Sequence, residues 1–232
     1  MSVMDAHSQL IVSTHSQLTA VGFVRVCSWE PRDTPKLLQQ YEACLATAGD
    51  EKPLQEFLTN HPSMLTQQLG GSCRWVRPQV ALGNAYVPDF LVARIDSVSL
   101  HWTLVELESP TAPLFLKQKG KQNRPAEKLR EGLDQIAEWR RWLAANADYA
   151  QRPRRGSKEG LGLVEINSQA RGLVVIGRRA SMSDEDRSSR SHLGLERQAL
   201  IRTYDWLADE ARKAHRYSLT TNEPCDECVL LA

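Results

Sequence analysis

Two neighbouring apolar segments, joined by a short polar turn, constrain the fold of this chain more than any other feature. Residues 87–95 and 100–108 are rich in β-branched and other apolar side chains, and residues 96–99 between them are polar. This pattern predicts a β-hairpin. The apolar residues fall on both faces of each strand, which is typical of central strands covered on both sides. We therefore expect the hairpin to lie in the middle of a sheet.

The register of this hairpin determines where its acidic side chains point. A four-residue turn sets Ile95 opposite Leu100. Counting back along the antiparallel strands then places Asp89 opposite Glu106, on the same face. Glu108 returns to that face because side chains alternate along a strand. A turn one residue longer or shorter would move Asp89 to the other face, and the acids would then be ordinary solvent-exposed charges near strand ends.

Three carboxylates at one site favour a bound cation. Burying like charges without compensation costs several kcal/mol per ion. Oxygen ligands select Mg²⁺, Mn²⁺ or Ca²⁺ over Zn²⁺, and Mg²⁺ is usually shared between carboxylates and the phosphate oxygens of a substrate. The hypothesis is therefore phosphodiester chemistry with Mg²⁺ or Mn²⁺ as the cofactor.

Composition places the chain among ordinary globular proteins. Its 232 residues suffice for one large domain, or for one domain with extensions. The 29 Lys and Arg residues are balanced by 28 Asp and Glu residues, so any basic surface for nucleic acid must be local. No segment has the roughly 20 apolar residues of a membrane span, and no signal peptide opens the chain. We expect no membrane association and a cytoplasmic location.

The five cysteines do not form a recognisable framework in the sequence. Their spacing is uneven, and their odd number argues against full disulfide pairing. Cys225 and Cys228 have the spacing of half a zinc site, but a closed site needs four ligands and no second pair lies nearby in the sequence. The sequence alone therefore gives little support to zinc binding there.

The remaining segments alternate between helical and extended patterns, which indicates an α/β fold. Helical patterns occupy 34–49, 50–60, 123–146 and 183–197, with a last helix beginning at Asp205. Extended patterns occupy 21–27, 74–82, 172–177 and 199–203. We expect an N-terminal extension over residues 1–33 with a frayed start, a folded domain over 34–217 and a flexible C-terminal tail over 218–232.

Basic side chains in loops are candidates for binding DNA phosphates. Lys and Arg gain affinity for DNA by releasing counterions, although such loops can equally be solvated surface. The candidates are Lys117, Lys119 and Lys121 after the hairpin, Arg154 and Arg155 in a later polar loop, and Arg178 after an apolar strand. On the long helix that follows the hairpin, Gln135 is placed to face the carboxylates if that helix packs over them.

Several short motifs carry a resemblance to known nucleases. Pro88-Asp89, followed by a strand with Glu106-Leu107-Glu108, resembles the PD-(D/E)XK signature. From about Leu37 to His215 the chain resembles the Shedu family of bacterial anti-phage defence proteins, specifically their C-terminal nuclease domain. The motifs are Glu56-Phe-Leu-x-x-His-Pro62, Val87-Pro-Asp-Phe90, Leu104-Val-Glu-Leu-Glu-Ser-Pro110, Gln135-Ile-x-x-Trp139, Arg171-Gly-Leu-Val-Val-Ile-Gly-Arg178 and Thr203-Tyr-Asp-x-Leu207.

The resemblance implies a PD-(D/E)XK, restriction-endonuclease-like α/β fold, with a central mixed sheet flanked by helices. It also implies Mg²⁺-dependent cleavage of DNA in defence against phage or plasmids. By position, Asp89 and Glu106 would bind the metal, with the Leu107 carbonyl nearby and Gln135 contributed by the following helix. Nucleases with this hairpin often place a helical Glu beside the metal, and Glu56 is a candidate, although an exposed helical Glu is more common.

Glu108 departs from the pattern, because a Lys usually occupies this position. Some restriction enzymes of the superfamily also have Glu here. Glu108 would then act as a third metal ligand or as the general base. The expected activity is that of a metal-dependent endodeoxyribonuclease with an ExE variant of the ExK motif.

Two other functions remain open. The loss of the Lys is compatible with a DNA-binding or sensor module that keeps the nuclease fold without catalysis, and a metal titration would separate the two. The third possibility is a structural subunit, because Trp139 and Trp142 are candidates for an oligomer interface. We expect a homo-oligomer, which does not exclude nuclease activity.

Overall fold

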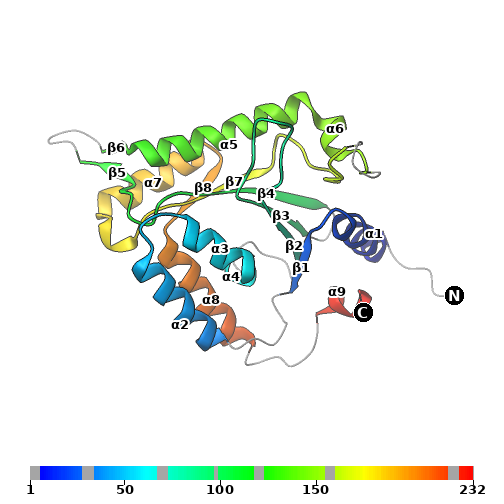
Figure 1. The fold of residues 1–232 in the computed structure, drawn as a ribbon, viewed down its shortest axis with the longest axis horizontal. Helices are drawn as coiled ribbons and strands as arrows, with labels where there is room; N and C mark the ends of the chain where they lie inside the picture. The colour runs from blue at the N-terminus through cyan, green and yellow to red at the C-terminus, as the bar shows by residue number, and fades with distance from the viewer. Residues whose placement is uncertain are drawn as a thin grey trace.

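A computed structural model describes residues 6–27, 34–66, 73–96, 99–117, 123–154, 160–218 and 225–231. At its centre is a six-stranded mixed sheet in the order β1-β2-β3-β4-β7-β8 (Figure 1). The strands are β1 (Val24–Cys27), β2 (Cys73–Pro78), β3 (Phe90–Ile95), β4 (Leu100–Leu107), β7 (Arg171–Val175) and β8 (Ala199–Arg202). The first four are antiparallel neighbours, whereas β7 and β8 add in parallel. This is the expected α/β fold with a central mixed sheet.

The hairpin has the register that the sequence predicts. Ile95 pairs with Leu100, and the pairing continues to Phe90 and Val105. A hydrogen bond of 3.1 Å from the backbone N–H of Asp96 to the carbonyl of Ser99 closes the turn. Asp89, directly before β3, is therefore level with Glu106, the residue after Val105.

Helices cover both faces of the sheet, as the apolar pattern of the hairpin requires (Figure 1). Leu91 and Leu104 face a core shared with Leu133 of the long helix α5, whereas Phe90 and Val105 face a second core. On the first side lie α1 (Ala6–Ala20), α5 (Glu127–Ala145), α6 (Ala147–Gln151) and α7 (Asp184–Glu196). On the second side lie α2 (Thr34–Thr47), α3 (Lys52–Asn60), α4 (Ser63–Thr66) and α8 (Tyr204–Ser218).

Shorter elements complete the chain. A two-stranded ribbon of β5 (Phe115–Leu116) and β6 (Arg124–Pro125) leads into α5, and a 3-10 turn (Arg179–Ser181) precedes α7. The expected capping box at the start of α7 is present, because Ser183 and Asp186 each bond the backbone N–H of the other. Within the described segments, every helix falls short of the length and apolarity that crossing a bilayer requires.

Three local expectations differ from the structure. From Ala6 the N-terminal segment is helical rather than frayed, because α1 buries Ile11, Thr14 and Leu18 at helical spacing. The polar Thr14 at the centre of this stripe conceals the period in the sequence. At the other end, α9 (Asp226–Leu230) is helical although an unstructured tail was expected there. Trp139 is 2% exposed and packs in the core, so it does not line an oligomer interface.

Candidate active site

Three acidic side chains approach one another at one end of the hairpin. Asp89 directly precedes β3, Glu106 lies near the end of β4, and Glu108 directly follows β4. Glu106 is 8% exposed and Glu108 is 4% exposed, whereas Asp89 is half-buried. The alternative in which these acids are ordinary solvent-exposed charges therefore fails for both glutamates.

Asp89 is held from two sides. Its Oδ2 accepts a hydrogen bond of 2.7 Å from the backbone N–H of Leu107, and its Oδ1 accepts one of 2.5 Å from Nε2 of Gln55. The hairpin register places Asp89 level with Glu106, and the two carboxyl groups interact electrostatically. Helix α3 and the end of β4 thus fix the position of the Asp89 carboxylate.

Burial raises the pKa of all three acids. For Glu106 the negative charges of Asp89 and Glu108 raise the pKa further. For Asp89 the backbone hydrogen bond from Leu107 opposes the effect of burial. Burial raises the pKa of Glu108 to about 7, although the neighbouring Lys128 ammonium lowers it. Without a metal ion, the cluster thus retains protons that a divalent cation would displace.

The backbone of Glu108 is fixed by its neighbours. Its N–H donates to the carbonyl of Val175 at 2.8 Å, and its carbonyl accepts from the hydroxyl of the buried Tyr204 at 2.9 Å. The hydroxyl of Tyr41 in turn donates to the Tyr204 carbonyl at 2.9 Å. Helices α2 and α8 therefore determine where the strand end, and with it the third carboxylate, is placed.

Helix α5 crosses directly over Glu108. A Cβ atom at Gly132 would lie 3.3 Å from Oε1 of Glu108, so a larger residue there would require Glu108 to shift by a few tenths of an ångström. One turn earlier on α5, Nζ of Lys128 lies 3.8 Å from Oε2 of Glu108 and 2.9 Å from Glu131. Gln135 lies one turn after Gly132 on α5 and is half-buried. The sequence did not predict this role of Lys128, because the basic residues it singled out lie in loops and after a strand rather than on this helix.

Helix α3 contributes residues other than the expected one. Glu56 is exposed, whereas Gln55 bonds Asp89 and Glu51, at the start of α3, raises the pKa of Asp89 and of Glu106. Residues 51 and 55 are one helical turn apart and share a face, from which residue 56 is rotated away. The sequence shows the spacing of these two residues, but it does not show which side of α3 faces the acids.

The candidate phosphate-binding residues are scattered. Lys117 is exposed and close enough to Asp186 to lower the pKa of that acid, and Arg154 is exposed near Arg77. Arg178 donates from Nε and Nη2 to Asp205, at 3.0 to 3.3 Å. Lys119, Lys121 and Arg155 lie outside the described residues.

The donors present fit a hard divalent ion. Mg²⁺ is usually held by one or two carboxylates together with water and substrate oxygens, and the neighbouring pair of Asp89 and Glu106 meets that need. Among the described residues, the metal-ligand atoms that all lie within 4.8 Å of one another are four cysteine sulfurs, and the three carboxylates form no such compact set.

Comparison with known proteins identifies the family. A family model described as Shedu protein SduA, C-terminal, matches residues 48–208, which include all the acids of the site together with Gln55, Lys128 and Gln135. Comparison with curated proteins gives no match. Because the family model covers more than half of the chain, this protein belongs to the family of Shedu SduA C-terminal domains.

Proposed function

We propose that this protein is a metal-dependent DNA endonuclease that hydrolyses phosphodiester bonds with Mg²⁺ or Mn²⁺. Its family implies a defence-related role, and the proposed substrate is the DNA of phage or plasmids. The observation that supports the proposal best is the placement of Asp89 level with Glu106, where their charges interact, with the buried Glu108 beside them. Such a cluster is costly to keep unless a cation binds it.

Each residue of the site has a role in this proposal. Asp89 and Glu106 would hold the ion, and Gln55 and the Leu107 N–H would orient Asp89. When bound, the ion supplies positive charge that stabilises the transition state and makes water more acidic. Glu108 would accept the proton of the attacking water, and its pKa of about 7 suits a general base near neutral pH.

Lys128 offers a substitute for the Lys that the nuclease signature usually has at position 108. Its ammonium comes from α5 rather than from β4, and it lies 3.8 Å from the carboxylate of Glu108. A positive charge there favours the ionised form of Glu108 and offsets charge that develops on the phosphate. This contact supports an active nuclease despite the change at Glu108.

Cleavage of supercoiled plasmid DNA tests the proposal. The wild-type protein should nick or linearise the plasmid with Mg²⁺ or Mn²⁺ and not without a divalent ion. Asp89→Ala should be inactive, whereas Glu56→Ala, on the exposed side of α3, should cleave like the wild type. Equal nicking by the wild type and Asp89→Ala would refute the proposal.

The second candidate is a DNA-binding or sensor module with the nuclease fold. The single observation in its favour is Glu108 at the position where the signature has Lys. This candidate predicts DNA binding without cleavage and no need for Mg²⁺, which calorimetric titration with Mg²⁺ measures. Binding of Mg²⁺ that depends on Glu106, together with cleavage, would exclude it.

A further inference from the structure

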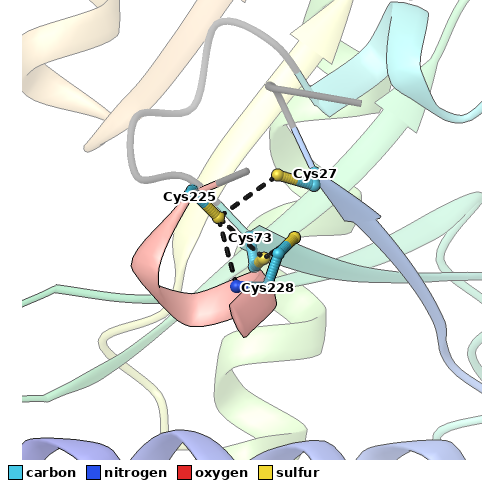
Figure 2. A group of neighbouring side chains, drawn as sticks. All are labelled: Cys27, Cys73, Cys225 and Cys228. Carbon is cyan, nitrogen blue, oxygen red and sulfur yellow. Dashed lines mark hydrogen bonds between the residues drawn. The ribbon is translucent and has the colours of Figure 1, made fainter. Parts of the chain in front are cut away.

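Four of the five cysteines meet at the edge of the sheet (Figure 2). Cys27 ends β1 and pairs directly with Cys73, which begins β2. Cys225 caps α9, and Cys228 lies in the first turn of that helix. The sequence concealed this arrangement, because the second pair is made by strand register rather than by a second Cys-x-x-Cys motif.

The sulfur atoms have the spacing of ligands around one ion. Sγ of Cys225 lies 3.4 Å from that of Cys27 and 3.7 Å from that of Cys73, and Cys73 and Cys228 are 3.5 Å apart. Tetrahedral zinc with Zn–S bonds of about 2.3 Å sets its sulfurs about 3.8 Å apart. Disulfide sulfurs are about 2.05 Å apart, and none of these four cysteines is joined in a disulfide. In an iron–sulfur cluster the cysteines bind different irons and lie farther apart.

We propose that these four cysteines bind one Zn²⁺ in a closed structural site. Four thiolates fill the tetrahedral shell of the ion and leave no open position for chemistry. The site is separate from the proposed nuclease centre. The family match does not account for it, because Cys27, Cys225 and Cys228 lie outside the matched residues 48–208.

The surroundings match a negatively charged zinc site. Four thiolates and one Zn²⁺ carry a net charge of about −2. Nη1 of Arg25 donates to Sγ of Cys228 at 2.9 Å and to Sγ of Cys73 at 3.8 Å. Arg74 is only 2% exposed, and its neighbours include Cys27, Cys73 and Glu227. A buried guanidinium is stabilised by nearby anions, and thiolates would add to the negative charge of Glu227.

Backbone contacts already arrange the ligands. The N–H of Cys228 donates to Sγ of Cys225 at 3.3 Å, and the N–H of Cys73 donates to the Glu227 carboxylate at 2.6 Å. Second contacts of this kind orient ligands in zinc sites. Zinc at this point would fasten the C-terminal segment to β1, the edge strand of the sheet. Edge strands are prone to pairing with other chains, and a C-terminal segment fastened there would shield β1.

Metal analysis of the full-length protein tests the proposal. After purification in reducing buffer without added metal, mass spectrometry of the elements should find about one zinc per chain and little iron. Cys228→Ser and Cys225→Ser should lower the zinc content by about fivefold or more. Cys44→Ser is the matched control, because Cys44 bonds the Pro53 carbonyl away from the cluster and should keep its zinc. Asp89→Ala should keep it too, which separates this site from the nuclease centre.

Two further measurements guard against effects of misfolding. Cys228→His should retain zinc, because a Cys₃His set also binds it. Cobalt added to the zinc-free wild type should give the visible absorption of a tetrahedral thiolate site. A wild-type protein without zinc, one that contains iron instead, or equal zinc in the wild type and in Cys228→Ser would overturn the proposal.

Discussion

The carboxylate of Asp89 accepts a hydrogen bond from the backbone N–H of Leu107, with 2.7 Å between Oδ2 and N. This bond links the residue before β3 to the last residue of β4, and so joins the two strands at the end of the hairpin opposite the turn. It keeps Asp89 level with Glu106, so that the two carboxyl groups interact electrostatically. The register of one hairpin therefore determines whether the acids can act together.

Removing the charge of Asp89 should abolish cleavage without unfolding the protein. Asp89→Asn keeps an oxygen that can accept from Leu107 but loses the anionic metal ligand. We expect at least about a 100-fold loss of plasmid cleavage with Mg²⁺, and a melting temperature close to that of the wild type. Cleavage within a few-fold of the wild-type rate would show that Asp89 does not hold the metal.

Two adjacent residues of α3 should differ sharply in effect. Gln55 donates to Asp89 at 2.5 Å, whereas Glu56 is exposed. Gln55→Ala should lower the cleavage rate about tenfold, because a ligand loses the partner that orients it. Glu56→Ala should leave the rate within about twofold. If Glu56→Ala lowered the rate more than Gln55→Ala, Glu56 rather than Gln55 would be the residue of α3 that assists the site.

Lys128 should set the pH at which the enzyme works. Its ammonium lowers the pKa of Glu108, so Lys128→Ala should raise that pKa. A base must be deprotonated to act, and the rising limb of the pH–rate profile should therefore move to higher pH, with about a tenfold lower rate at pH 7. Lys213→Ala, on the distant α8, should change neither the rate nor the profile. A profile of Lys128→Ala that overlays the wild type would contradict this role.

The stability of the protein should respond to pH through Glu108. Folding raises the pKa of this acid from 4.5 to about 7. Between these values the folded state binds more protons than the unfolded state, so stability falls as pH rises. In buffer without divalent ions, the free energy of unfolding of Glu108→Gln relative to the wild type should thus be about 2 kcal/mol higher at pH 8 than at pH 5. Urea unfolding at both pH values measures this difference, and an equal difference at the two would refute the expectation.

Much of the fold was readable from the sequence because it depends on local signals. The four-residue turn between β3 and β4 indicated the register, and the alternation of side chains along a strand then placed Asp89 beside Glu106. The capping box at Ser183 marked the start of α7. In each case the informative residues are neighbours along the chain.

The contributions of the packed helices could not be read in this way. Lys128 and Gln55 reach the acids only because α5 and α3 are oriented by the core, and no local pattern specifies that rotation. The cysteine cluster depends on the pairing of Cys27 with Cys73 and on α9 lying beside them. Such contacts join segments far apart in the sequence, and one sequence by itself does not show them.

The most direct test of the metal site is a crystal soaked in Mn²⁺, measured by anomalous scattering. The account predicts a manganese peak about 2 Å from carboxylate oxygens of both Asp89 and Glu106. A soaked crystal without manganese between these residues would contradict it.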